Sequence, residues 1–188
     1  MSDSPLRLGV IIGSVREGRV GPTVADWLLS RLKERHEFEV DLIDLADFDL
    51  PARLDGGGHT AEYLAHLDRA DAFVVVTPEY NHGYPGSLKI AIDTAKEEWL
   101  AKPVAFVAYG GVAGGLRSVE QLRPVFAELH AVTVRTAVSL HGVHSLFGED
   151  GRLLDPGKTE AAADDMLNQL GWWAHTLRAG RGNGTFRG

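Results

Sequence analysis

The chain has 188 residues, a formal net charge of −7 at neutral pH and no cysteine. This length fits one domain that can bury a core without disulfide or metal cross-links, and the lack of cysteine excludes thiolate nucleophiles and thiolate metal sites. The acidic balance argues against a general nucleic-acid binder. Residues 1–5 lack the basic-then-apolar pattern of a leader and no window approaches a membrane span, so we expect a cytoplasmic protein with no membrane partner.

The first predicted strand, residues 6–12, runs into a loop rich in glycine and arginine. Apolar residues at helical spacing from Pro22 onward predict a helix whose N-terminus closes this loop. Exposed backbone N–H groups, the helix dipole and the side chains of Ser14, Arg16 and Arg19 would all favour a bound anion. We therefore interpret the loop as a phosphate site, with an exposed basic loop as the alternative.

Two better-known phosphate motifs do not fit this loop. Gly13 and Gly18 have the spacing of the P-loop glycines, but Arg19 and Val20 stand where lysine and a hydroxyl residue belong. The three spaced glycines of a dinucleotide fold are also missing. Two neighbouring arginines suit a terminal monophosphate dianion better than a buried pyrophosphate.

The third predicted strand, residues 72–76, is a continuous apolar run, as expected of a buried parallel strand. It leads into residues 77–86, Thr-Pro-Glu-Tyr-Asn-His-Gly-Tyr-Pro-Gly, which should face a ligand because ligands bind at the carboxyl ends of such strands. Between the first and third strands, residues 38–45 predict the second strand, with Asp44 in the turn at its end. Thr60 or a neighbour is predicted to cap the helix that follows.

After the third loop, Ser87 is predicted to cap a helix that carries Trp99 on its buried face. The fourth strand, residues 102–108, ends in a glycine-rich loop at 109–115 that would let backbone approach a planar ligand. In the next helix, Pro124 predicts a kink or break. Arg117 and Arg123 of that helix are candidates for a second anion, although solvated helix charges are the default interpretation.

The last quarter of the chain is harder to interpret. Residues 131–136 predict the fifth strand, and residues 137–157 are long for a structureless connection, which favours a hairpin or an oligomer contact. His141 and His144 have no evident third ligand nearby, so we predict no metal site. A final helix, starting near residue 155 or 159, precedes a glycine-rich end.

Strands that alternate five times with helices predict an α/β fold, a doubly wound five-stranded parallel sheet with helices on both faces. If the strand order is 2-1-3-4-5, the loops at residues 14–21 and 78–86 flank one crevice, an arrangement that suits flavin mononucleotide (FMN). We expect one domain over residues 1–179 and a flexible tail at 180–188.

Residues 13–19, residues 77–81 with 85–89, and the glycine-rich loop that ends at Gly114 and Gly115 resemble the NAD(P)H-dependent FMN reductase family of flavodoxin-like proteins, which includes quinone and chromate reductases. The resemblance covers residues 6 to about 130. It implies a set of FMN contacts to the phosphate and to both sides of the ring: Ser14, Arg16, Arg19, Val20 and Gly21; Pro78, Glu79, Tyr80 and Asn81; and Gly110 and Gly111. Many members carry asparagine where this chain has Gly21, and a small hydroxyl residue where it has Tyr109.

By the same resemblance, the protein would transfer hydride from NADH or NADPH to bound FMN and pass electrons to a quinone, a flavin or a similar oxidant in a ping-pong cycle. Such chemistry needs no catalytic side chain, and backbone N–H groups of residues 78–81 would stabilise charge on the reduced ring. Related reductases commonly form dimers or tetramers, so a homodimer or homotetramer is expected. A flavodoxin-like electron carrier and a nonenzymatic flavin sensor are the alternatives, and a conventional NAD-dependent dehydrogenase is a weaker one.

Overall fold

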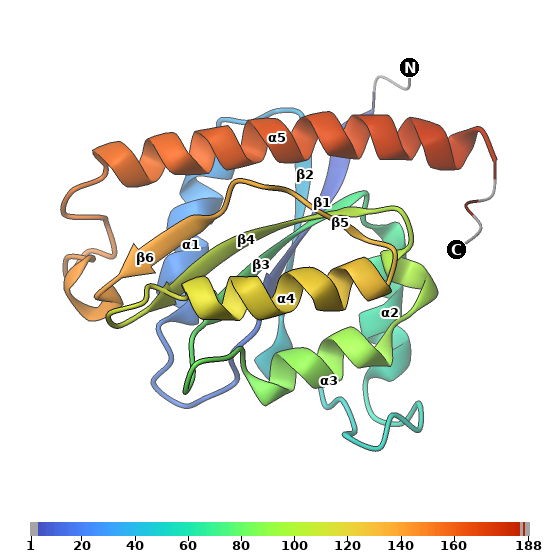
Figure 1. The fold of residues 1–188 in the computed structure, drawn as a ribbon, viewed down its shortest axis with the longest axis horizontal. Coiled ribbons are helices and arrows are strands. Elements are labelled where there is room, and N and C mark those ends of the chain that lie inside the picture. The colour runs from blue at the N-terminus through green and yellow to red at the C-terminus, as the bar shows by residue number, and fades with distance from the viewer. Residues whose placement is uncertain (1–3, 185, 187–188) are drawn as a thin grey trace.

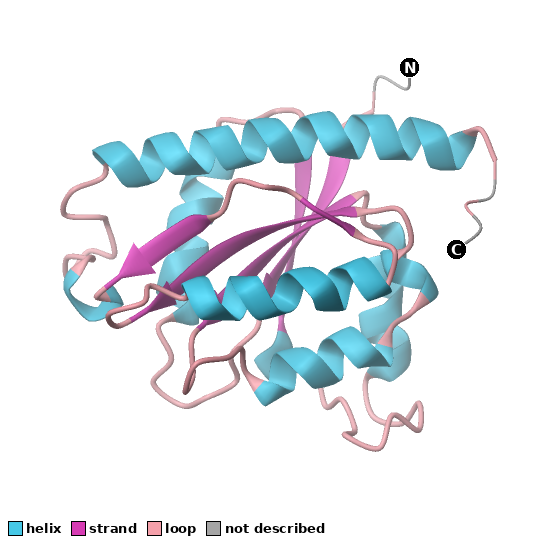
Figure 2. Cartoon of the chain, in the orientation of Figure 1, coloured by secondary structure: helices cyan, strands magenta, loops and turns pink. Residues whose placement is uncertain are grey.

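A parallel sheet runs through the centre of the computed structural model, which describes residues 4–184 and 186 (Figures 1 and 2). The sheet order is β2-β1-β3-β4-β5, and β6 also pairs with β4. The doubly wound α/β fold and the predicted order 2-1-3-4-5 are therefore confirmed. The strands are β1 (Leu6–Ile12), β2 (Phe38–Asp44), β3 (Ala72–Pro78), β4 (Pro103–Gly110), β5 (Val132–Thr133) and β6 (Val138–His141).

Five α-helices of the described chain cover the two faces of the sheet (Figure 2). They are α1 (Gly21–Leu32), α2 (Thr60–Arg69), α3 (Gly86–Thr94), α4 (Leu116–Glu128) and α5 (Gly157–Gly182). Helices α1 and α5 bury side chains such as Leu28 and Leu170 in the core on one face, while α2, α3 and α4 bury Tyr63, Ile92 and Phe126 on the other. None of the helices in the described part of the chain is long and apolar enough to cross a bilayer.

The fifth strand differs from the prediction because it is split. Both pieces pair with β4 in parallel: Val104 lies opposite Thr133, and Val107 lies opposite Val138. Three steps along β4 thus match five steps along its neighbour, so two extra residues bulge out between β5 and β6. The hairpin predicted within residues 137–157 is wrong for residues 138–141, which extend the sheet in parallel, and the alternative of an oligomer contact stays a prediction. Further on, an isolated antiparallel bridge joins Phe147 and Leu153.

Two expectations about α3 are corrected. Pro85 occupies the N-cap position, and the hydroxyl of Ser87 instead donates to the carbonyl of Gly13, 2.8 Å away, in the loop after β1. Trp99 lies beyond α3, in the short 3-10 helix η2 (Glu97–Trp99). It is fully buried and its indole N–H donates to the carbonyl of Ile92 at 3.1 Å, so its predicted place in the core is confirmed.

Two further expectations concern Pro124 in α4 and the end of the last helix. Helix α4 continues past Pro124 to Glu128, so the proline does not break it. Helix α5 ends at Gly182, beyond the predicted domain boundary at 179, and Arg181 in its last turn donates to the carbonyl of Ala101 and to the carboxylate of Asp71. Residues 185, 187 and 188 of the predicted tail lie outside the described residues.

Candidate functional site

The loops after β1, β3 and β4 meet at the carboxyl edge of the sheet, where strand ends of different elements converge (Figure 1). A crevice of about 230 Å³ lies between them. Eight of the sequence-predicted contacts line it: Arg16, Arg19, Val20, Pro78, Glu79, Tyr80, Gly110 and Gly111. Three others lie outside the lining: Ser14 and Asn81 belong to the same loops, and Gly21 is the first residue of α1. The convergence expected from the strand order is therefore present.

The loop after β1 presents backbone donors without acceptors. Among the described residues, no acceptor takes the N–H groups of residues 15, 17, 18 and 20. Gly18 has φ +66°, a left-handed conformation that glycine adopts readily, and α1 begins immediately after Val20 with Pro22 in its first turn. Unpaired N–H groups next to a helix N-terminus form an environment that favours an anion.

Arg19 is tied down within this loop. Its Nη1 and Nη2 donate to the two carboxylate oxygens of Asp44, each at 2.6 Å, and Nη1 also donates to the carbonyl of Ser14 at 2.5 Å. Asp44 ends β2 and its Oδ1 accepts the N–H of Ala46 at 3.1 Å, which confirms the predicted turn. The side chains of Arg19 and Asp44 are each only 16% exposed.

Ser14 and Tyr80 connect the loop after β1 to the loop after β3. The hydroxyl of Ser14 is fully buried and lies 2.6 Å from the hydroxyl of Tyr80, and the guanidinium of Arg16 lies 5.0 Å from the centre of the Tyr80 ring. Arg16 itself is exposed. Ser14 therefore joins two walls of the crevice, and Arg16 is the more accessible cation at its mouth.

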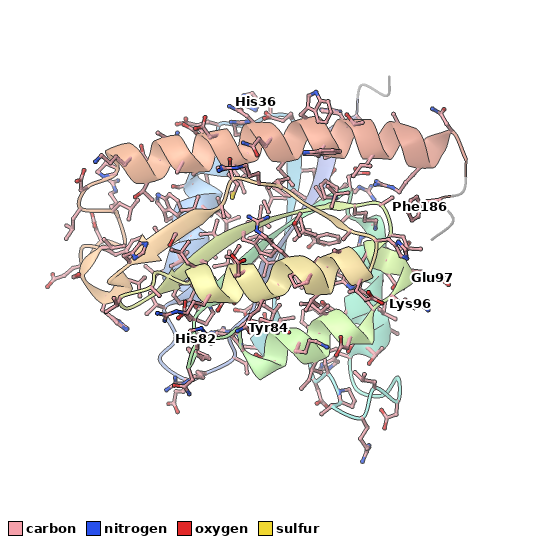
Figure 3. All side chains as sticks on the ribbon, viewed as in Figure 1. His36, His82, Tyr84, Lys96, Glu97 and Phe186 are labelled. Atoms are coloured by element: carbon pink, nitrogen blue, oxygen red, sulfur yellow. The ribbon has the colours of Figure 1, made fainter. Side chains whose placement is uncertain are left out.

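The loop after β3 contains a tight reverse turn. Tyr80 and Gly83 exchange both backbone hydrogen bonds, at 2.9 and 3.2 Å, and the two residues between them have positive φ angles, +50° for Asn81 and +76° for His82. The amide of Gln121 in α4 donates to the carbonyl of His82 at 2.8 Å. Figure 3 labels His82 and Tyr84 on this loop, beside the first turns of α3 and α4.

This turn limits which backbone groups face a ligand. The N–H of Glu79 donates to the carbonyl of Tyr109, and that of Tyr80 donates to Gly83. Pro78 has no N–H, so within residues 78–81 only Asn81 keeps an N–H with no acceptor among the described residues. Of the backbone N–H groups of residues 78–81 that were expected to face the ligand, only that of Asn81 is therefore left to do so.

The two arginines predicted as candidates for a second anion have different partners. The Nη1 of Arg117 donates to the carboxylate of Glu79 at 2.8 Å, and its backbone N–H donates to the same carboxylate at 3.2 Å. Arg123 donates to the carbonyls of Val134 and Arg135, at 2.8 and 2.9 Å, so it holds the bulge between β5 and β6. Arg117 is thus paired with Glu79 of the crevice lining, whereas Arg123 contacts the edge of the sheet.

Residues that follow β6 complete the crevice, and the sequence reasoning missed them. Val143 and His144, in the 3-10 helix η3 (Val143–Ser145), line the same crevice as the loops after β1, β3 and β4. The end of β6 also holds the glycine-rich loop after β4. The Nδ1–H of His141 donates to the carbonyl of Val112 at 2.9 Å, and the hydroxyl of Ser139 donates to the carbonyl of Gly114 at 2.8 Å. The alternating residues 138–141 were the signal that could have indicated this strand.

Tyr109, at the end of β4, also lines the crevice and was not predicted as a site residue. Its hydroxyl is buried and has no hydrogen-bond partner among the residues that the structure describes. Burial raises the pKa of this hydroxyl above its ordinary value, Tyr80 raises it further, and Arg19 opposes the change. A β-carbon on Gly21 would lie 3.0 Å from the same hydroxyl, so the tyrosine fills space beside this glycine.

The sheet order and the ligand crevice at its switch point define a flavodoxin-like α/β protein. The solved structure of FerB, a flavoenzyme NAD(P)H:(acceptor) oxidoreductase from Paracoccus denitrificans, superposes with a TM-score of 0.73 over 92% of this chain and 98% of its own, at 22% identity. A structure of a flavodoxin from the domain Archaea superposes with a TM-score of 0.57 over 92% of this chain and 99% of its own, at 12% identity.

Sequence comparison gives the family. The model of NADPH-dependent FMN reductases matches residues 6–145. An NAD(P)H-dependent FMN reductase of Schizosaccharomyces pombe is 39% identical over 56% of this chain, a match that spans 58% of that protein. A quinone reductase of Escherichia coli is 30% identical over 88% of this chain and 92% of its own length. The chain belongs to the NADPH-dependent FMN reductase family, which confirms the resemblance drawn from the loop motifs.

Proposed function

We propose that the protein is an FMN-dependent oxidoreductase that takes hydride from NADH or NADPH and delivers electrons to a quinone, a flavin or a similar oxidant. The observation that carries this proposal is the loop after β1, whose N–H groups at residues 15, 17, 18 and 20 have no acceptor among the described residues. Together with Arg16 they offer the donor set that a phosphate monoester needs. Membership of the family supports the same cofactor.

Bound FMN would supply the hydride-accepting chemistry, and the protein would supply binding, orientation and exclusion of water. The loop after β1 would hold the phosphate. Pro78, Tyr80 and Asn81 would border one side of the ring, with the N–H of Asn81 as the donor toward developing negative charge. Gly110 and Gly111 would allow backbone to approach from the β4 side.

We propose that nicotinamide and oxidant use the crevice in turn, because the same loops border the space that either would enter. This predicts ping-pong kinetics, with parallel lines in double-reciprocal plots at different acceptor concentrations. The homodimer or homotetramer and the cytoplasmic location stay predictions. Two exposed apolar side chains near the crevice favour self-association: Val112 is 97% exposed and Leu116 is 51% exposed.

The test is a flavin titration followed by anaerobic reduction. Purified protein should bind FMN at micromolar concentration, and NADH or NADPH should bleach the bound flavin without oxygen. Addition of a quinone or free flavin should then restore the oxidised spectrum over many turnovers. Bound flavin that neither nicotinamide reduces would favour the carrier or sensor, and failure to bind FMN would overturn the proposal.

A further inference from the structure

We propose that Asp44 is a positioning residue for the cofactor phosphate: it holds Arg19 so that one defined pair of guanidinium N–H groups faces the crevice. This inference rests on the proposed function, because it concerns the phosphate of FMN. Asp44 lies outside the crevice lining, whereas Arg19 is part of it. Asp44 would therefore act on the ligand only through the arginine.

The count of donors on Arg19 carries the argument. A guanidinium has five N–H groups. One on Nη1 and one on Nη2 go to the two oxygens of Asp44, at 2.6 Å each, and the second on Nη1 goes to the carbonyl of Ser14. The two that remain, on Nε and on the Nε side of Nη2, are parallel and adjacent. They form the side-on fork that matches two oxygens of a phosphate.

The position of Asp44 is fixed independently of Arg19. It is the last residue of β2 and the N-cap of the 3-10 helix η1 (Leu45–Asp47), and its Oδ1 accepts the N–H of Ala46 at 3.1 Å. Its carboxylate is therefore anchored by the sheet and by the following turn. A side chain with several rotatable bonds, such as that of Arg19, loses most of its freedom when it is held bidentately on such an anchor.

The charges of these residues predict opposite changes in FMN affinity for the two possible roles of Asp44. The pair of Arg19 and Asp44 is neutral as a unit, so Arg19 would contribute oriented hydrogen bonds, while Arg16, which makes no ion pair within the described chain, would contribute net positive charge. If charge alone mattered, removal of the Asp44 carboxylate would strengthen the binding of a phosphate dianion. If Asp44 positions the fork, its removal weakens that binding.

The experiment compares FMN with riboflavin, which has the same ring and no phosphate, by quenching of flavin fluorescence in wild type and in Asp44→Asn. Asparagine has the same shape and can still accept the N–H of Ala46. We expect FMN to bind about 10-fold more weakly in the variant, as for loss of one charge-assisted hydrogen-bonding arrangement, and riboflavin affinity to be unchanged. Asp47→Asn, which removes an exposed carboxylate from the same short helix, is the matched control and should change neither affinity.

A double-mutant cycle separates positioning from a general effect on the fold. Arg19→Lys keeps the positive charge but removes the fork, so it should weaken FMN binding while riboflavin binds as before. Asp44→Asn should then add little to Arg19→Lys, because the group that it positions is already gone. Circular dichroism and thermal unfolding check that each variant is folded at the temperature of the binding measurements.

Equal or tighter FMN binding by Asp44→Asn, or an equal loss of FMN and riboflavin affinity, would overturn the assignment of Asp44. Full additivity of the two substitutions would do the same. Wild-type protein that binds no FMN would instead overturn the proposed function, so the two failures are distinguishable.

Discussion

Lys102 is a buried lysine immediately before β4, at the opposite end of that strand from the crevice. The residue is only 6% exposed. Its Nζ donates to the carbonyls of Leu67 and Asp68, near the C-terminal end of α2, at 2.8 and 2.9 Å. Burial, with a smaller contribution from the charge of Arg181, lowers the pKa of Lys102 from 10.5 to about 8. A neutral amine has two N–H groups, which match these two carbonyls, whereas an ammonium has a third.

The sign of the pH dependence follows from proton binding. Between about pH 8 and 10.5 the unfolded chain keeps the Lys102 proton and the folded protein has lost it. Stability therefore rises with pH in this window, by about 1.4 kcal/mol per pH unit where the two states differ by a whole proton. From pH 8 to pH 10 we expect Lys102 to add about 2 kcal/mol to the free energy of unfolding.

The assay is urea unfolding of wild type and Lys102→Met at pH 7, 8, 9 and 10, with the free energy of unfolding extrapolated to water. Groups common to both proteins cancel in the difference, including buried Tyr63 and Tyr109, whose pKa values are raised. The difference, wild type minus variant, should be level below pH 8 and should rise above it. Lys158→Met shows the effect of removing an exposed lysine. A difference for Lys102→Met that stays level up to pH 10 would refute the reasoning.

Two further predictions concern close approaches around the crevice. Gly115→Ala should destabilise the protein by about 2 to 3 kcal/mol in urea unfolding, because φ is +85° and the new β-carbon would lie 2.5 Å from that of Ala108; Gly111→Ala, with nothing within 4 Å, is the control and should cost under about 0.5 kcal/mol. Gly21→Ala should cost about 1 to 3 kcal/mol, and Tyr109→Phe in the same protein should recover part of that loss, because it removes an unpaired buried hydroxyl next to the new methyl group. An unchanged cost in that double variant would contradict the second.

The parts of the fold that depend on local pattern were predictable. The apolar run at 72–76 became the fully buried β3, and Pro22 stands in the first turn of α1, as its missing N–H allows. The strand order then placed the loops after β1 and β3 beside one crevice, because ligand loops gather at a topological switch point. These inferences needed only periodicity, proline and glycine chemistry, and the rules of parallel sheets.

The split of the fifth strand was not predictable in the same way. Residues 131–136 carry the β-branched signal, yet only Val132 and Thr133 pair as β5, and β6 begins at Val138. The bulge between them is held by the guanidinium of Arg123, which bonds carbonyls 11 and 12 residues away. Hydrogen bonds that reach from a helix to a strand edge have no local sequence signature, so the strand register could not be inferred.

The hydrogen-bond partners of the loop side chains were the part of the site that the sequence predicted least. The sequence motif assigns Ser14 and Arg19 to a ligand, but the structure gives Ser14 to Tyr80 and Arg19 to Asp44, which are 66 and 25 residues away. Ser87, an apparent helix cap, holds the loop after β1 through Gly13, 74 residues earlier. Serine, arginine and aspartate side chains at strand ends can form hydrogen bonds with many different groups. Which partner each one takes depends on the packing of the whole sheet, which the local sequence does not reveal.

These contacts show that residues predicted to bind the ligand also fix the conformation of the loop after β1. A phosphate site works through backbone N–H groups that must be held apart from their usual acceptors, and this costs conformational entropy unless the loop is fixed before the ligand arrives. Ser87 in α3 fixes the start of the loop after β1, Tyr80 contacts that loop from the loop after β3, and Asp44 fixes Arg19 from the end of β2. Helix α3, the loop after β3 and the end of β2 thus hold one loop in the open form that a phosphate would need, and the bonds among the side chains make that form a property of the fold itself.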